Sequence, residues 1–316
     1  MVEEARGVVR IPVVFVNAYL VESPQGFAIV DTGLQGVGVS LIQRAVSDRF
    51  GPDARPQSIV LTHGHFDHAG SAQALADAWD VPVYAHRLEL PYLTGLSDYP
   101  PQDPTVGGTL ANLSRLFPRG AIDLSSRIRA LPDDRTVPGL PGWKVIPTPG
   151  HTRGHVSLFR EADGVLLAGD ALATMNQESL GETFLQNRQL RWPPAPLTTD
   201  WQAAARSLDH LATLRPTTIA AGHGLTMTGD NVAETLARFS RSFTPPRYGR
   251  YVNQPARANE YGVISLPPRV TDPVGIGLRA AAVAGLVGAA YLGMRRAQLR
   301  YADGDRADAS HEYPDR

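Results

Sequence analysis

The chain has 316 residues, of which 43% are hydrophobic and 19% are charged, and its formal net charge is -1. This composition favours a folded enzyme with a substantial core, and the absence of a basic excess argues against a nucleic-acid-binding protein. The sequence contains no cysteine, which excludes disulfides, thiolate metal sites and cysteine nucleophiles. Histidine and aspartate remain as the side chains for metal chemistry.

Short apolar segments alternate with amphipathic segments along the first 245 residues, which predicts a layered α/β domain. We expect strands at 26–30, 58–61, 81–85, 143–147, 156–159, 165–167 and 219–221, and helices at 38–50, 71–79 and 199–214. A threonine or aspartate at the start of the last helix is a plausible cap.

Three histidines and an aspartate lie within six residues, directly after the apolar segment 58–61; they are His63, His65, Asp67 and His68. Alternation along an extended segment would point His63 and His65 in the same direction, which leaves Asp67 and His68 to face a second ion. Imidazole and carboxylate suit a borderline divalent ion such as zinc. The motif predicts half of a binuclear metal site.

Three further polar side chains follow apolar strand candidates beside glycines; they are His151, Asp170 and His223. Loops at strand ends are where such ligands are expected. His155 lies four residues after His151, and we expect it to order the His151 loop rather than to bind a metal. Structural or solvated positions are expected for the remaining histidines considered, which are His86, His210 and His311.

The pattern HxHxDH, then a lone His, an Asp and a final His, resembles the metallo-beta-lactamase superfamily over roughly residues 8 to 240. The resemblance implies a four-layer αββα sandwich with the metals at one edge, between the two sheets. It implies two ligand groups and one bridge: His63, His65 and His151; Asp67, His68 and His223; and Asp170 between them. Asp31, in the turn 29–33, would support the ligand loop from outside. Two zinc ions per chain are expected, with iron or manganese as alternatives.

Such a metal pair lowers the pKa of bound water toward neutrality, so we predict a hydrolase that uses a metal-bound hydroxide. Asp67 and Asp170 would orient the water or carry a proton to the leaving group. The expected substrate is a small molecule with an ester, thioester, lactone or amide bond. The segments 62–63 and 222–224 are similar to those of glyoxalase II-like thioesterases and lactonases, although Ala171 stands near where family lactonases often carry a tyrosine.

Other reactions are known on this fold, and the sequence leaves some of them open. A mononuclear iron sulfur (persulfide) dioxygenase shares much of the ligand pattern, and sequence does not identify the metal. Flavin-linked di-iron enzymes typically have a glutamate where His65 stands, which argues against that class. A phosphodiesterase or nuclease is less favoured, because the chain has no basic stripe. All seven ligand positions are present, which also disfavours a non-catalytic binding protein.

Two insertions are expected beside the pocket, at 91–116 and 173–197. The first is rich in proline, glycine and tyrosine, and it is either a lid or a plain surface loop. The second follows Asp170, and its aromatic residues either line the pocket or belong to the core. These loops would set substrate choice, since the metal ligands set the reaction.

Residues 246–316 form a region of different character: a Pro/Arg-rich segment, a small-residue apolar helix and a polar tail. The uncharged stretch 280–294 is shorter than the ~20 residues of a usual membrane span. It could pack on the catalytic domain or a partner subunit of a homo-oligomer, anchor the chain at a membrane surface through 274–296, or form a marginal span. The acidic start of the chain lacks the features of a secretory signal, so we expect a cytoplasmic protein.

Overall fold

The computed structural model of the chain describes residues 1–118, 122–176 and 187–277. The chain divides into two compact units, Met1–Val270 and Thr271–Arg316. In the described part of the second unit, residues 273–277 are helical. The predicted apolar helix at 280–294, the polar tail and His311 lie outside the described residues. Residues 246–270 belong to the first unit, while a functional boundary at residue 245 stays a prediction.

The first sheet has seven strands in sequential order, antiparallel from β1 to β4 and parallel from β4 to β7. Its strands are β1 (Val2–Ala5), β2 (Val8–Val13), β3 (Val16–Ser23), β4 (Gly26–Val30), β5 (Ser58–Val60), β6 (Val83–Ala85) and β7 (Ile128–Ala130). The parallel strands bring the carboxyl ends of β4, β5 and β6 to one edge of the sheet. Loops that leave this edge can therefore meet.

The second sheet has five strands in the order β12-β11-β10-β9-β8. They are β8 (Trp143–Pro147), β9 (Val156–Arg160), β10 (Val165–Gly169), β11 (Thr218–Ala221) and β12 (Met227–Thr228). Only β10 and β11 pair in parallel, so their carboxyl ends also share an edge. A separate hairpin is formed by β13 (Arg257–Asn259) and β14 (Gly262–Ser265).

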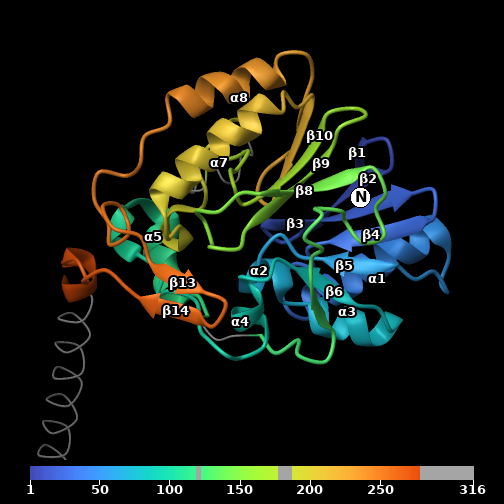
Figure 1. The fold of residues 1–316 in the computed structure, drawn as a ribbon, viewed down its shortest axis with the longest axis horizontal. Coiled ribbons are helices and arrows are strands. Elements are labelled where there is room, and N and C mark those ends of the chain that lie inside the picture. The colour runs from blue at the N-terminus through green and yellow to red at the C-terminus, as the bar shows by residue number, and fades with distance from the viewer. Residues whose placement is uncertain (119–121, 177–186, 278–316) are drawn as a thin grey trace, which may run out of the picture. The chain divides into compact units, whose positions relative to one another are not determined.

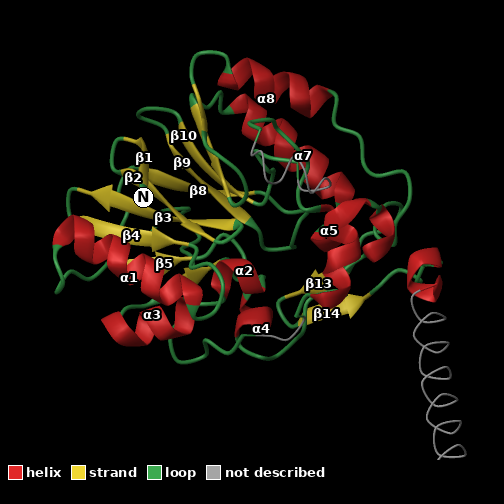
Figure 2. Cartoon of the chain, turned by 180° about the vertical axis from the view of Figure 1, so that it is seen from behind, coloured by secondary structure: helices red, strands yellow, loops and turns green. Residues whose placement is uncertain are grey.

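Helices cover the outer face of each sheet (Figure 1). The described helices are α1 (Val37–Phe50), α2 (Phe66–Ala69), α3 (Ala72–Trp79), α4 (Leu90–Leu93), α5 (Gly108–Leu113), α7 (Trp201–Thr213) and α8 (Val232–Arg241), with short 3-10 turns at Pro104–Val106, Ser114–Leu116 and Ala195–Leu197. α1 and α3 lie on the first sheet, and α7 and α8 lie on the second (Figure 2). The Asp200 side chain accepts a hydrogen bond from Ala203 N at 2.8 Å, so the predicted cap of α7 is this aspartate.

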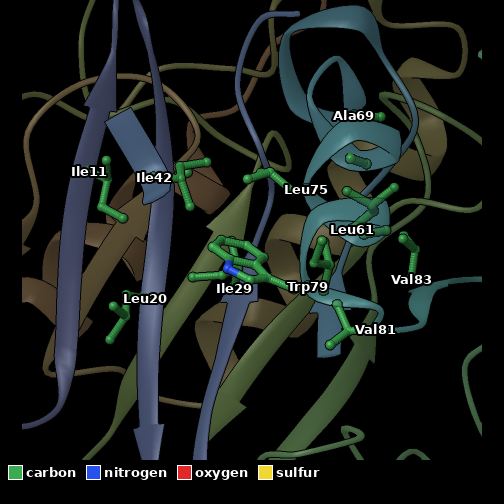
Figure 3. Packing of buried hydrophobic residues seen from close by; sticks show 14 of the residues in the cluster. Ile11, Leu20, Ile29, Ile42, Leu61, Ala69, Leu75, Trp79, Val81 and Val83 are labelled. Carbon is green, nitrogen blue, oxygen red and sulfur yellow. The ribbon is translucent and has the colours of Figure 1, made fainter. Parts of the chain in front are cut away.

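Three apolar clusters hold these layers together. Ile42 of α1 and Leu75 and Trp79 of α3 pack against Ile29 and Leu61 on the first sheet (Figure 3). A second cluster fills the space between the sheets, with Val30 and Val60 facing Val145 and Leu158. The third lies under α7 and α8, where Leu208 and Leu236 cover Leu166. The layers therefore run helix, sheet, sheet, helix, which confirms the predicted four-layer αββα sandwich.

Among the described residues, we find no helix with the length and apolar character needed to cross a membrane. The predicted membrane association through 274–296 concerns mainly residues outside the described ranges, and it stays a prediction.

The turn between β2 and β3 contains a strained residue. Val14 and Phe15 join the two strands, and Val14 has a φ of 62° with 68% of its surface exposed. A positive φ at the first position of a two-residue hairpin is a feature of type II′ turns, which favour glycine there. A β-branched residue in this conformation costs about 1–2 kcal/mol.

We therefore expect Val14→Gly to raise the free energy of unfolding by about 1 kcal/mol, because it relieves the strain without removing a buried contact. Thermal denaturation followed by circular dichroism measures the change. Val37→Gly, at another exposed valine but without a positive φ, is the control and should not stabilise the chain. A lower melting temperature for Val14→Gly would contradict the strain argument.

Candidate metal centre

The HxHxDH motif begins just after β5 and runs into the one-turn helix α2. His63 and His65 lie in the loop, and His65 is the residue that precedes the first turn of α2. Asp67 and His68 lie within α2. The expected separation of the pair His63 and His65 from the pair Asp67 and His68 is therefore produced where the chain changes from extended to helical, and not by strand alternation alone.

The other predicted ligands come from the second sheet. His151 lies in the turn between β8 and β9, Asp170 directly follows β10, and His223 lies two residues after β11. All seven predicted ligand side chains are buried. The structure thus brings together residues from two sheets that are up to 160 positions apart in the sequence.

The ligand atoms form three overlapping groups, each with its atoms within 4.8 Å of one another. The groups are His63, His65 and His151; Asp67, His68 and His223; and His63, His68 and Asp170. The first two are the triads that the resemblance implies, and the third connects them. Binding of metal by these residues stays a prediction.

The Asp170 carboxylate lies between the two triads. Its Oδ2 is 3.5 Å from His151 Nε2 and 3.3 Å from His223 Nε2, and its Oδ1 is 3.4 Å from His68 Nε2. This is the position expected for a bridging carboxylate. Within the first triad, His65 Nδ1 and His151 Nε2 lie 2.9 Å apart, so both rings point at the same place.

Four buried atoms at the centre have no hydrogen-bond partner among the described residues: His63 Nε2, Asp67 Oδ1, and His68 Nε2 and Asp170 Oδ1, which form an ion pair with each other at 3.4 Å. Leaving a buried polar atom unsatisfied costs about 1–3 kcal/mol. A divalent cation would satisfy both a nitrogen lone pair and a carboxylate oxygen, and nitrogen and oxygen ligands suit zinc, iron and manganese. The residues present therefore fit a metal site.

Asp31 contacts the motif from outside the centre, and its expected supporting role stays a prediction. It accepts hydrogen bonds from Thr62 N and from Thr62 Oγ1, and its Oδ2 lies 2.8 Å from His68 Nδ1. His63 Nδ1 lies 3.1 Å from the same Thr62 hydroxyl. With Nδ1 engaged in this way, both imidazoles present Nε2 to the centre, so a single carboxylate orients one histidine of each triad.

Backbone and hydroxyl groups orient the other histidines. His223 Nδ1 is 2.9 Å from Phe15 O in the β2–β3 turn, and the two rings are stacked. His151 Nδ1 is 3.3 Å from Thr198 Oγ1. The N-terminal sheet also holds the His223 loop, because Asn17 Nδ2 donates to Ala221 O at 3.0 Å and to Gly224 O at 2.8 Å.

His155 contacts the Asp170 backbone. Its Nε2 accepts a hydrogen bond from Asp170 N at 2.9 Å, while its Nδ1 lies 2.8 Å from Thr148 Oγ1. The expected role of His155, ordering the His151 loop, stays a prediction. The contacts show that His155 also holds the backbone of Asp170. Of the remaining histidines, His86 is half-buried and accepts a hydrogen bond from Leu88 N, whereas His210 is exposed on α7.

Burial and neighbouring charges divide the histidines into two classes. Burial lowers the pKa of His63 and His151 well below the ordinary value and the pKa of His65 to about 3, so these rings are neutral, which is the form that binds metal. Burial is the largest effect on His68 and His223 and opposes their charge, but the carboxylates around them, Asp170 first, together outweigh it and raise the pKa of both. A metal ion would displace the protons of this second class.

The pKa values of Asp67 and Asp170 are shifted in opposite directions. Burial raises the pKa of Asp67, although His68 and His223 oppose the change. Burial also acts to raise the pKa of Asp170, but the adjacent His223 and His68 hold it well below its ordinary value. These two histidines therefore favour the carboxylate form of Asp170.

A pocket adjoins His151. Its lining comes from four separate parts of the chain: Tyr92, Tyr99, Pro100, His151, Thr152, Arg153, Thr199, Ala256 and Ala258. Tyr92 and Tyr99 come from the insertion 91–116, which thus contributes to the pocket. In the second insertion, residues 177–186 lie outside the described residues, and the nearby Trp192 packs edge-on against Trp201 in the core.

Sequence reasoning missed Phe15, Thr198 and Glu89. Phe15 contributes a backbone carbonyl, which leaves no signature in a sequence. Thr198 stands next to the predicted helix 199–214 but outside any motif. Glu89 is a fully buried acid that follows β6, and an acid between apolar residues, in Leu88-Glu89-Leu90, was the available signal.

Comparison with known proteins agrees with this arrangement. The metallo-beta-lactamase superfamily model matches residues 11–223, a span that includes all seven predicted ligands. The chain belongs to the metallo-beta-lactamase superfamily. "Probable metallo-hydrolase YflN" of Bacillus subtilis is 44% identical over 75% of this chain and 91% of its own length.

Solved structures of this superfamily share the fold. The BLEG-1 B3 metallo-beta-lactamase is 26% identical, with a TM-score of 0.50 over 74% of this chain and 96% of that one. A superfamily protein from the archaeon Sulfolobus tokodaii has a TM-score of 0.53 at 18% identity, over 87% of this chain and 94% of that one.

Replacing Asp31 tests the outer support of the centre. In Asp31→Asn, the amide nitrogen can only donate, so either Thr62 N or the pair formed by Thr62 Oγ1 and His68 Nδ1 loses its acceptor. We expect zinc affinity to fall about 10- to 100-fold, the usual cost of losing such a partner. Competition with a chromogenic chelator measures it. Asp48→Asn, on the exposed face of α1, should bind zinc as the wild type does, and equal affinities in all three proteins would refute the role of Asp31.

Proposed function

We propose that the chain is a metal-dependent hydrolase that cleaves an ester, thioester, lactone or amide bond of a small molecule. The observation that carries this proposal is the convergence of seven buried ligand-type side chains, with His63 Nε2 and Asp67 Oδ1 left without a hydrogen-bond partner in the part of the chain that the structure describes. The name of its Bacillus subtilis relative, a probable metallo-hydrolase, supports the same reaction class.

Two divalent ions, zinc by preference, would be held by His63, His65 and His151 on one side and by Asp67, His68 and His223 on the other, with Asp170 common to both. Ions in such a site supply a hydroxide at neutral pH and polarise the bond to be cleaved. Neutral imidazoles and carboxylates are the ligands that zinc prefers. Iron and manganese remain alternative metals for the same ligand set.

The chain's own residues position the reaction. Asp67 Oδ1 lies in the buried centre with no competing partner, so it is free to accept a proton and deliver it to a leaving group. Asp170 is held by three histidines and is better suited to fixing their positions. The aromatic and apolar wall beside His151 excludes water from one side of the centre.

The pocket composition favours a small organic substrate. Tyr92, Tyr99, Pro100, Ala256 and Ala258 offer apolar surface, and Arg153 stands at the same pocket. These residues place apolar surface beside the proposed site of cleavage.

Replacing Asp67 separates chemistry from folding. Asp67→Ala should lower kcat at least 100-fold, because it removes a proton-transfer group and a ligand, while the apolar layers keep the fold. Turnover, circular dichroism and metal content are measured on the same preparation. Asp77→Ala, on the exposed side of α3, is the matched control and should keep full activity. Wild-type turnover in folded, metal-loaded Asp67→Ala would exclude the proposed role.

The reaction class itself is tested by metal analysis together with a substrate panel. We expect about two zinc ions per chain, as in binuclear hydrolases, and cleavage of at least one chromogenic ester, thioester, lactone or amide. Chelation should abolish that cleavage, and added zinc should restore it. About one iron per chain, with no hydrolysis but oxygen consumption with a persulfide, would overturn the proposal and favour a dioxygenase.

A further inference from the structure

Glu89 is a fully buried carboxylate that belongs to neither ligand triad. It follows β6 in the first sheet and precedes α4. Among the described residues, its hydrogen-bond partners are backbone N–H groups and hydroxyls rather than an arginine or lysine. A buried carboxylate is costly unless each oxygen is well satisfied, so its retention calls for a specific role.

The two oxygens of Glu89 serve two different loops. Oε1 accepts hydrogen bonds from Thr152 Oγ1 at 2.7 Å and from Gly154 N at 2.9 Å, both in the His151 loop. Oε2 accepts from Gly64 N at 3.0 Å, between His63 and His65, and from the Tyr99 hydroxyl. One carboxylate therefore joins the loop of the first sheet to the loop of the second, on the side of the first triad.

The glycines in these loops allow the close approach. A Cβ on Gly154 would lie 2.8 Å from Glu89 Oε1, and a Cβ on Gly64 would lie 2.6 Å from the Tyr99 hydroxyl and 2.8 Å from Leu93 Cδ2. A side chain at either position would separate the loop from the carboxylate. The glycine in His63-Gly-His65 and the glycine in Thr152-Arg-Gly-His155 are therefore both needed for the two loops to reach Glu89.

Tyr99 extends the same network to the pocket. Its hydroxyl donates to Glu89 and accepts from Gly64 N at 2.9 Å, while its ring packs on His65 with centroids 4.5 Å apart. Tyr92 stacks on the other side at 4.1 Å. Glu89 therefore also fixes the aromatic wall beside His151.

We infer that Glu89 is a positioning residue that holds His63, His65 and His151 at the separation required to bind one metal ion, and that sets Tyr99 as a wall of the substrate pocket. This inference rests on the proposed function, since it concerns the same centre. The carboxylate acts through the loops and does not touch the metal or the substrate. Its effect should appear in metal affinity and ligand geometry, and not only in stability.

Glu89→Gln is the discriminating variant. An amide has one acceptor oxygen in place of two, so either Gly64 N or Gly154 N loses its acceptor and faces an N–H donor. We expect zinc affinity to fall about 10- to 100-fold, as for other residues that orient ligands. The absorption spectrum of the cobalt-substituted protein should change, and kcat on a cleaved panel substrate should fall more than KM rises.

Two milder variants keep the carboxylate. Thr152→Val removes one hydrogen bond to Oε1, and Tyr99→Phe removes the hydroxyl from Oε2. Both should fold, weaken zinc binding by less than Glu89→Gln does, and alter the cobalt spectrum. Glu161→Gln is the matched control, because Glu161 is an exposed acid paired with Lys144, and it should match the wild type in every measurement.

The outcomes separate this inference from the proposed function. Lower melting temperature with wild-type zinc affinity and an unchanged cobalt spectrum in Glu89→Gln would show a merely structural role and overturn the inference alone. If Glu89→Gln does not fold, wild-type zinc affinity in both milder variants overturns it. Wild-type protein that binds neither zinc nor cobalt would overturn the proposed function and the inference together.

Discussion

The central constraint on this structure is that seven polar side chains are buried in one place. Most of the histidine rings among them have a holding hydrogen-bond partner on only one of their two nitrogens. Each histidine that a protein group holds by one nitrogen presents its other nitrogen to the centre, and an unmatched buried atom costs about 1–3 kcal/mol. The rest of the fold supplies the holding groups: a carboxylate at Asp31, a backbone carbonyl at Phe15 and a hydroxyl at Thr198. The two sheets are thus joined by polar contacts at one edge and by apolar packing elsewhere.

Much of the architecture could be predicted because its signals are local. The strands 143–147 and 26–30 have the predicted bounds, since each is a short apolar run ended by glycine or proline. The seven ligand positions were found because each follows such a run. Their metal-binding role still awaits measurement.

The remaining features depend on contacts that no local pattern encodes. The carbonyl of Phe15 meets His223 only after the two sheets have packed, and Glu89 meets Thr152 across the same interface. Likewise, Tyr251 is buried and donates to Pro101 O, so part of the Pro/Arg-rich segment packs within the first unit. Composition suggested a change of character after residue 245, whereas packing is set by partners more than a hundred positions away.

The predicted ligands and the pocket wall come from different kinds of segment. The ligands stand on strand ends that the superfamily shares, while the wall beside His151 is assembled from Tyr99, Thr199 and Ala256 in three separate segments. Of the three, Tyr99 and Thr199 also contact the loops that carry the predicted ligands, so Ala256 is the position where a change would alter the wall with least effect on those loops.

The contact between the first hairpin and the last ligand loop also bears on the order in which the protein is made. Asn17 N donates to Gly222 O at 2.8 Å, and the Tyr19 hydroxyl donates to Ala221 O at 2.7 Å. Synthesis on the ribosome runs from the N-terminus, so the β2–β3 hairpin emerges some two hundred residues before the strand it holds. The group Asp67, His68 and His223 cannot assemble until that strand has emerged, so any metal that this group binds would enter after nearly all of the first unit has been translated.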